Sequence, residues 1–238
     1  MRLPPTGYDA AGRYRGNVLT LLLTRHGHTD KSEPEQYLGQ RLAASLTERG
    51  RHDAQALAAR LEGVLIDRIV TSPLGRAVET AHILAAERGL AVEPDDRLTE
   101  LDYGVWEGLT LDQINARFPG EYERYEHDPA EHAVGGGESG REVAARLGKM
   151  IEELLDWAAA EARAGADGRT CLLVGHSSVN RILLAMLLGV ALIDYRRRFD
   201  QDWANLTVLR WPDRASGARL LLSNDQSHAR GIRGATWG

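Results

Sequence analysis

The stretch that decides the fold is Val18-Leu19-Thr20-Leu21-Leu22-Leu23, followed at once by Thr24-Arg25-His26-Gly27-His28-Thr29. A short run that is apolar on both faces is typical of a central strand in a parallel sheet that helices cover on both sides. The polar residues after the run then lie at the carboxyl end of that strand, where open α/β sheets bind ligands. We therefore expect Arg25 and His26 to stand at a functional edge of the sheet.

The rest of the chain alternates between predicted strands and predicted helices. Short apolar runs predict strands at 66–71, 90–92, 170–174, 206–211 and 218–223. Apolar residues at helical spacing predict helices over 47–62, 75–88, 139–164 and 179–188. This alternation predicts a three-layer α/β fold, with a mostly parallel sheet between helices on both faces. The last two strands are joined by a tight turn and form a hairpin, so the sheet is expected to be mixed.

A chain of 238 residues is long enough for one large domain. We expect a flexible N-terminal segment over 1–16, a single domain over 17–226 and a C-terminal tail over 227–238. Residues 104–137 mix aromatic and charged side chains and end in three glycines, which favours a cap insert lying over one end of the sheet. Within this insert, Thr110 and Gln113 predict a capping box at the start of a short helix.

The composition limits the classes of partner. A formal net charge of −5 argues against a general nucleic-acid binder, which usually carries a basic patch. The longest apolar stretch, 182–193, is shorter than the roughly 20 residues of a membrane span, so no membrane partner is expected. Residues 1–16 lack the apolar core of a signal peptide, and we expect a cytoplasmic protein. The edge strand of such a sheet is a surface through which two copies could pair as a homodimer.

Cysteine and arginine usage give two further expectations. Cys171 is the one cysteine, which excludes an intrachain disulfide and a cysteine metal cluster, and its apolar strand indicates a packing role. The run Arg196-Arg197-Arg198 is interpreted as a solvated face, and contact with a partner or a polyanion stays open as the alternative.

Two further strand ends carry the same kinds of side chain as the first. The second strand leads through Ser72-Pro73-Leu74-Gly75 to Arg76, and the strand at 170–174 leads to Gly175-His176. Two guanidinium groups and two imidazoles then converge on one edge. Such a set stabilises the oxygens of a phosphoryl group in transfer without a metal ion. A neutral histidine is a competent nucleophile at phosphorus, and carboxylates for acid catalysis are available at Glu100, Asp102 and Glu107.

These residues carry a resemblance to a known family. The strand ending Leu21-Leu22-Leu23, with Arg25-His26-Gly27 after it, resembles the signature of the histidine phosphatase superfamily, phosphoglycerate mutase-like branch. Three later segments resemble its other motifs in the same order: 72–77, 100–108 and 175–177, and the late pair Asn224 and His228 fits as well. Four motifs in order are specific, whereas Arg-His-Gly alone would be weak. The resemblance implies a phosphoglycerate mutase-like fold with a small cap insert.

The resemblance also implies a role for each residue. His26 would attack phosphorus and form a phosphohistidine, while Arg25, Arg76 and His176 would hold the phosphoryl oxygens. Glu100 would protonate the leaving group and later activate water, with Asp102 as the competing acid. No metal and no cofactor is implied, and the expected partner is a small phosphorylated metabolite.

Substrate contacts are expected from a second set of residues. A helix start at Ser177 would add backbone N–H donors to phosphate. Ser32 stands where many relatives have a phosphate-binding Asn, and His28 where many have Glu. A leaving-group pocket would be lined by Tyr37, Trp106 and the 117–132 segment.

Several alternatives stay open. A phosphoglycerate mutase is the main one. The resemblance implies that a mutase would carry a basic insert and an Arg directly after the acid. Here the insert is acidic and Leu101 follows Glu100, which favours a phosphatase of small phosphomonoesters. The spacing His26-Gly27-His28-Thr29-Asp30 also occurs in some metallohydrolases. A module that binds a phosphorylated ligand without turnover and a phosphatase of phosphohistidine proteins are the remaining candidates.

Overall fold

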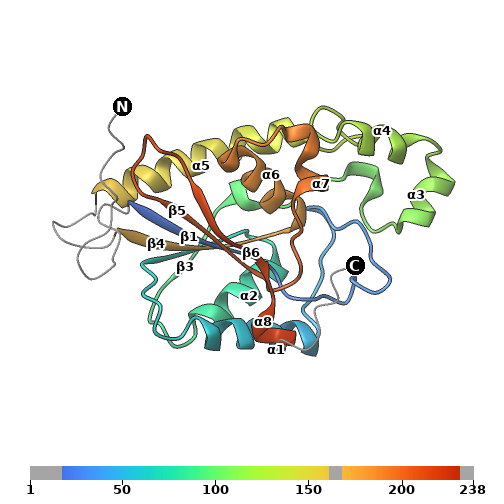
Figure 1. Cartoon of the computed structure of the whole chain (residues 1–238). Helices are drawn as coiled ribbons and strands as arrows, with labels where there is room; N and C mark the ends of the chain where they lie inside the picture. Colours follow the sequence, from blue (N-terminus) through green and yellow to red (C-terminus); the bar gives the residue numbers. More distant parts are fainter. Residues whose placement is uncertain (1–17, 161–167, 231–238) are drawn as a thin grey trace.

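The computed structural model describes residues 18–160 and 168–230 and shows three layers, with the sheet between two groups of helices (Figure 1). The strands are β1 (Leu19–Arg25), β2 (Arg68–Thr71), β3 (Val92–Pro94), β4 (Arg169–Gly175), β5 (Leu206–Trp211) and β6 (Arg219–Asp225), in the spatial order β3-β2-β4-β1-β5-β6. The first four run parallel, β5 is antiparallel to β1, and β6 is antiparallel to β5. The predicted mostly parallel, mixed sheet is confirmed.

Helices cover both faces of the sheet, as the alternating pattern predicts. On one face lie α1 (Glu48–Arg60), α2 (Gly75–Ala85) and the short α8 (Ser227–Arg230); on the other lie α5 (Gly140–Ala160), α6 (Ser177–Leu188) and α7 (Tyr195–Arg198) (Figure 1). Because successive strand residues point to opposite faces, Leu21 and Leu23 of β1 pack in the core with α5 and α6. Leu22 packs in the second core with α1 and α2. This double burial explains the continuous apolar run of β1.

The expected cap insert is built from short elements. It contains a 3₁₀ helix (Gly104–Trp106), α3 (Leu111–Arg117) and α4 (Glu121–His127); the other 3₁₀ helices are Asp96–Leu98 and Leu192–Asp194. The predicted capping box of Thr110 and Gln113 is present at the start of α3. The sequence does not predict α4, because a helix of 7 residues is too short to show a period.

The end of the described chain differs from the expected tail. Residues 227–230 form α8, where the Arg60 guanidinium of α1 contacts both Ser227 and His228. The His228 Nε2 donates to the carbonyl of Ala204 at 2.8 Å. The prediction of a tail is therefore wrong for these four residues. The predicted flexible segment 1–16, residues 161–164 of the predicted long helix, and 231–238 lie outside the described residues. None of the helices in the described ranges has the length and apolar character needed to cross a bilayer.

Candidate active site

The loop after β1 fixes the position of His26. The His26 backbone N–H donates to the carbonyl of Gly175 at the end of β4 (3.0 Å), and the Gly27 N–H donates to Thr80 Oγ1 of α2 (3.1 Å). Gly27 also packs on the first turn of α1, where a Cβ would lie 2.6 Å from the carbonyl oxygen of Gly50. Contacts from three elements therefore hold the loop, and a side chain at position 27 would push it away from α1.

The imidazole of His26 is held as a neutral ring with one free nitrogen. Its side chain is buried, with 4% exposed. The Nδ1 lies 2.8 Å from the Gly27 carbonyl, which can only accept, so Nδ1 carries the proton and Nε2 keeps its lone pair. Burial, and then the charges of Arg76 and Arg25, lower the pKa of His26 well below its usual value. An unprotonated Nε2 is the form that can act as a nucleophile.

Three further groups surround this ring and leave polar atoms unpaired. The His176 ring lies with its centroid 5.1 Å from that of His26. Arg76 donates to the carbonyl of Gly39 at 2.8 Å, and Arg25 donates to the carbonyl of Gln201 at 3.0 Å. In the described part of the chain, both ring nitrogens of His176 and the Nε atoms of the two arginines are buried without a hydrogen-bond partner. An unpaired buried polar group costs about 1–3 kcal/mol, so a cluster of them indicates a site built for an oxyanion.

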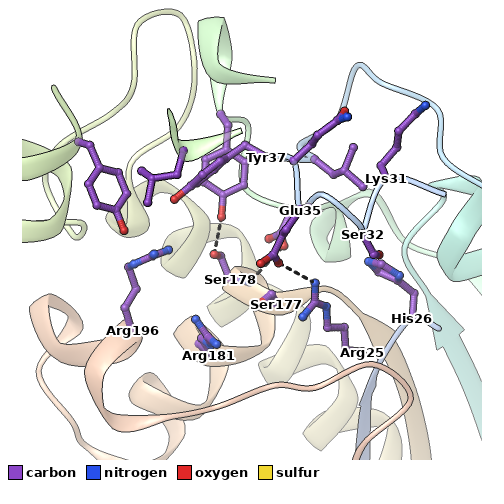
Figure 2. A pocket seen from close by; sticks show the side chains of 16 residues that line it. Arg25, His26, Lys31, Ser32, Glu35, Tyr37, Ser177, Ser178, Arg181 and Arg196 are labelled. Carbon is purple, nitrogen blue, oxygen red and sulfur yellow. Dashed lines mark hydrogen bonds and ion pairs between the residues drawn. The ribbon is translucent and has the colours of Figure 1, made fainter. Parts of the chain in front are cut away.

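A pocket of about 360 Å³ opens beside His26 (Figure 2). Six residues of the predicted site line it: Arg25, His26, Ser32, Tyr37, Glu100 and Ser177. Arg76 and His176 are buried next to His26 but are not on the pocket wall. The segments after β1, β2 and β4 therefore meet the segment around Glu100, with Arg76 and His176 buried behind the pocket wall.

Glu100 lines the pocket, while the two other candidate carboxylates do not. Its oxygens accept the backbone N–H groups of Ser178 (3.1 Å) and Val179 (3.0 Å) in the first turn of α6. Asp102 instead accepts the Gly104 N–H at 2.8 Å and an Arg41 N–H at 2.8 Å. The Glu107 carboxylate accepts hydrogen bonds from the backbone N–H groups of residues 40–42.

The helix start at Ser177 differs from the expected phosphate site. Ser177 lines the pocket, but the next two N–H donors of α6 are already bound by Glu100. The helix N-terminus thus holds a carboxylate of the protein, which favourable charge–dipole interaction stabilises.

Trp106, which the sequence places on the wall of the leaving-group pocket, does not line the pocket in the structure. It is 0% exposed and packs edge-on against Tyr37 (5.5 Å between ring centroids) and Tyr125 (5.4 Å). The expectation that Trp106 lines the leaving-group pocket is therefore wrong: an indole of this size is buried behind the wall. Of the 117–132 segment, Tyr122 reaches the pocket.

The two positions that depart from the family pattern make local contacts. The Ser32 hydroxyl accepts the Thr29 N–H at 3.0 Å and lies 3.1 Å from Thr29 Oγ1, although Ser32 also faces the pocket. His28 places Nδ1 3.0 Å from Thr47 Oγ1 and Nε2 3.3 Å from Glu33 Oε1. Across residues 18–160 and 168–230, no three His, Cys, Asp or Glu side chains gather as metal ligands.

Sequence reasoning misses four residues around the pocket. The Trp203 ring lies under the Arg25 guanidinium, 4.9 Å from its carbon, and Gln201 binds the same guanidinium. Arg181 of α6 and Arg196 of α7 line the pocket wall. The interpretation of 196–198 as a solvated face is therefore wrong for Arg196. The one sequence signal available was that Arg181 falls four residues after Ser177 and so shares its helix face.

Lowering the pH should destabilise the protein through its buried histidines. Burial and the neighbouring Arg76 lower the pKa of both His26 and His176, so the unfolded chain, with histidine near 6.5, binds more protons than the folded one. Stability then falls as the pH drops below about 6.5, by about 1.4 kcal/mol per pH unit for each histidine. Urea unfolding at pH 7.0 and 5.5 measures this slope. The double variant His26→Asn/His176→Asn should lose most of it, and an unchanged slope would contradict the assignment.

Comparisons with known proteins agree with this geometry. The sequence pattern of the "Histidine phosphatase superfamily (branch 1)" matches residues 21–226. The chain is 30% identical over 197 residues to phosphoserine phosphatase 1 of Hydrogenobacter thermophilus, covering 83% of this chain and 89% of that protein. It is 38% identical over 177 residues to glucosyl-3-phosphoglycerate phosphatase of Mycobacterium tuberculosis, covering 74% and 78%. The solved structure of Bacillus stearothermophilus YhfR matches with a TM-score of 0.79 and 31% identity, covering 89% of this chain and 99% of that one.

Proposed function

We propose a reaction from one premise: this chain belongs to the histidine phosphatase superfamily (branch 1) and is a phosphoric monoester hydrolase. The phosphatase-named relatives and the acidic insert favour hydrolysis over the mutase alternative. The substrates are small phosphomonoesters. In the proposed reaction, His26 is the nucleophile, and Arg25, Arg76 and His176 hold the phosphoryl oxygens.

The reaction has two steps on the same phosphorus atom. In the first, the His26 Nε2 lone pair forms a bond to phosphorus, the bond to the leaving oxygen breaks, and the Glu100 carboxyl gives that oxygen a proton. In the second, the Glu100 carboxylate takes a proton from water, the water oxygen bonds to phosphorus, and the P–N bond breaks. Inorganic phosphate leaves, and both side chains return to their starting state.

One observation carries the proposal: polar groups without hydrogen-bond partners are buried around the neutral ring of His26, whose Nε2 is free. The Arg25 Nε, the Arg76 Nε and the His176 ring are buried without partners in the described structure. Fixed donors of this kind act on the charge that a phosphoryl group spreads over its oxygens in the transition state. They need no reorientation when the substrate arrives, because Gly39 and Gln201 already anchor the two guanidiniums.

Two finer points complete the proposal. We infer that the enzyme works in the cytoplasm on a free metabolite and not on nucleic acid. The net charge of −5, the buried free thiol of Cys171 and the pocket of about 360 Å³ support this.

The edge strand β6, with Leu220 and Leu221 exposed, is the surface through which a homodimer would pair.

Phosphate release from p-nitrophenyl phosphate in the presence of EDTA tests the proposed function. We expect the wild-type rate to be the same with and without the chelator, because every group in the reaction belongs to the protein. In a parallel assay with 3-phosphoglycerate, phosphate release should exceed formation of the 2-isomer. Loss of activity in EDTA with recovery on adding zinc would contradict the mechanism and favour the His26–His28 metal alternative. Isomer formation without phosphate release would instead indicate the mutase.

A further inference from the structure

The pocket carries more positive charge than one phosphoryl site uses. In the view of Figure 2, Arg25 stands next to His26, and Arg181 and Arg196 follow along the same wall, away from His26. These two arginines belong to α6 and α7, outside the four motifs, and the proposed reaction gives them no role. Their position on the pocket wall therefore needs a separate explanation.

Arg181 is a largely buried cation whose hydrogen-bonding capacity is not used. Its side chain is 20% exposed, and its Nε is buried without a partner among the residues that the structure describes. Its Nη2 lies 3.8 Å from an oxygen of Asp200, too far for a hydrogen bond, and the Asp200 side chain is 83% exposed. A solvated partner at that distance contributes little, so the guanidinium remains available for a ligand.

Arg196 is anchored at one edge, which fixes its orientation beside the pocket. Its side chain is 18% exposed, its Nε donates to Glu126 at 2.7 Å, and its guanidinium stacks on Tyr125 at 5.1 Å. The charge of Arg196 is thus already paired with Glu126. Arg181 is the stronger candidate for binding an anion, and Arg196 adds a second positive group on the same wall.

The carboxylates that line the pocket leave Arg181 unpaired, whereas Arg196 pairs with Glu126 outside the pocket. The two in the pocket are Glu35 and Glu100. Glu100 binds the N–H groups at the start of α6, while Glu35 is exposed and lies 3.8 Å from Arg25. Burial lowers the pKa of Arg25, and the charges of Glu35 and Glu100 partly oppose this effect. The positive charge of Arg181 lowers the pKa of Arg25 further, which indicates that the two guanidiniums lie near each other.

We propose that Arg181, with Arg196 beside it, binds a second anionic group on the leaving-group side of the substrate. The preferred substrates are then small phosphomonoesters whose alcohol carries a carboxylate or a second phosphate. A guanidinium suits both, because its planar fork donates two parallel hydrogen bonds to either group. Tyr37, Leu111 and Tyr122 line the pocket as well and would contact the carbon skeleton between the two anions. The inference rests on the proposed function, which places the reacting phosphoryl group at His26.

Matched pairs of substrates test this proposal. O-Phosphoserine and O-phosphoethanolamine differ by a carboxylate, and 3-phosphoglycerate and glycerol 3-phosphate differ by a carboxylate in place of a hydroxymethyl group. In the wild type we expect a higher kcat/KM for the carboxylate member of each pair. The preference is the ratio of kcat/KM for the carboxylate member to kcat/KM for its partner. Arg181→Gln should lower this ratio about 10- to 100-fold, mainly through KM, because a hydrogen-bonded charge is lost. The kcat/KM values for propane-1,3-diol bisphosphate and its monophosphate are compared in the same way. A preference for the bisphosphate would indicate a site for phosphate, and its absence a site for carboxylate.

Two variants control for indirect effects. Arg197→Gln changes the next arginine of α7, whose side chain is 56% exposed and does not line the pocket, so the ratio should stay unchanged. Arg181→Lys keeps the charge and should recover part of the ratio. Equal losses for both members of a pair in Arg181→Gln, or no preference in the wild type, would overturn the second anion site. Lack of p-nitrophenyl phosphate hydrolysis by the wild type would instead overturn the proposed function.

Discussion

Replacing His26 by Asn is expected to lower kcat for every phosphomonoester by about 10⁴-fold or more. The variant has no ring nitrogen to attack phosphorus, and loss of a nucleophile removes a transition-state bond that other groups do not replace. Phosphate release under saturating substrate measures the effect. The unfolding midpoint of the variant in urea shows whether the fold is retained.

His28→Gln is the matched control for this prediction. His28 lies two residues along the same loop and is also buried, but its ring contacts Thr47, Glu33 and Trp203 and does not line the pocket. We expect this variant to keep its activity within about 10-fold, the range of a lost supporting hydrogen bond. An equal loss in both variants would indicate that the two histidines act together, as the metal alternative requires.

Replacing Glu100 by Gln has an effect that depends on the leaving group. For an alkyl phosphate such as glycerol 3-phosphate, we expect kcat to fall about 10²- to 10⁴-fold, the usual contribution of acid–base catalysis. For p-nitrophenyl phosphate the first step should be much less affected, because p-nitrophenolate leaves without a proton. The second step still needs a base, so rapid mixing should show a burst of p-nitrophenolate followed by a slow steady state.

Asp102→Asn provides the control for Glu100. The Asp102 carboxylate binds Gly104 and Arg41 and does not line the pocket, so the leaving-group dependence should stay as in the wild type. A larger loss of activity in Asp102→Asn than in Glu100→Gln would show that Asp102, and not Glu100, is the general acid. Equal loss of the first step for both substrates in Glu100→Gln would show that Glu100 positions α6 without transferring a proton.

The local patterns of the sequence predict the strands and the convergence of their ends. The apolar run of β1 is continuous because Leu21 and Leu22 enter different cores, and this double burial is visible in the sequence. Parallel strands bring their carboxyl ends to one edge, so Arg25, Arg76 and His176 could be placed together from topology alone.

The contacts that tertiary packing creates could not be predicted in this way. Trp203 lies under a guanidinium 178 residues earlier in the chain, and nothing local to either residue marks the pair. The sequence analysis places Trp106 in the leaving-group pocket with Tyr37, whereas the structure buries it behind the pocket wall. A sequence does not say which aromatic side chain of an insert faces the pocket and which one supports it from behind. The sequence groups Arg196 with Arg197, but consecutive helix residues point about 100° apart, so Arg196 is largely buried while Arg197 is exposed.

The position of Glu100 illustrates a second limit of sequence reasoning. A helix start after a strand end predicts free N–H donors for phosphate, and α6 begins at Ser177 as expected. Those donors bind Glu100, which lies 78 residues earlier. The same contacts hold the Glu100 carboxylate at the pocket wall, where the proposed reaction needs it.

The most direct test of the phosphohistidine mechanism is detection of a phosphoryl group on His26 during turnover. Glu100→Gln enzyme is mixed with p-nitrophenyl phosphate, quenched in alkali within the burst and digested for mass spectrometry. The mechanism predicts that the peptide containing His26 gains one phosphoryl group and that acid removes this group. The His26→Asn/Glu100→Gln enzyme should show no phosphoryl group on that peptide. A phosphoryl group on another residue, or an unmodified His26 peptide while p-nitrophenolate is released in a burst, would contradict the mechanism.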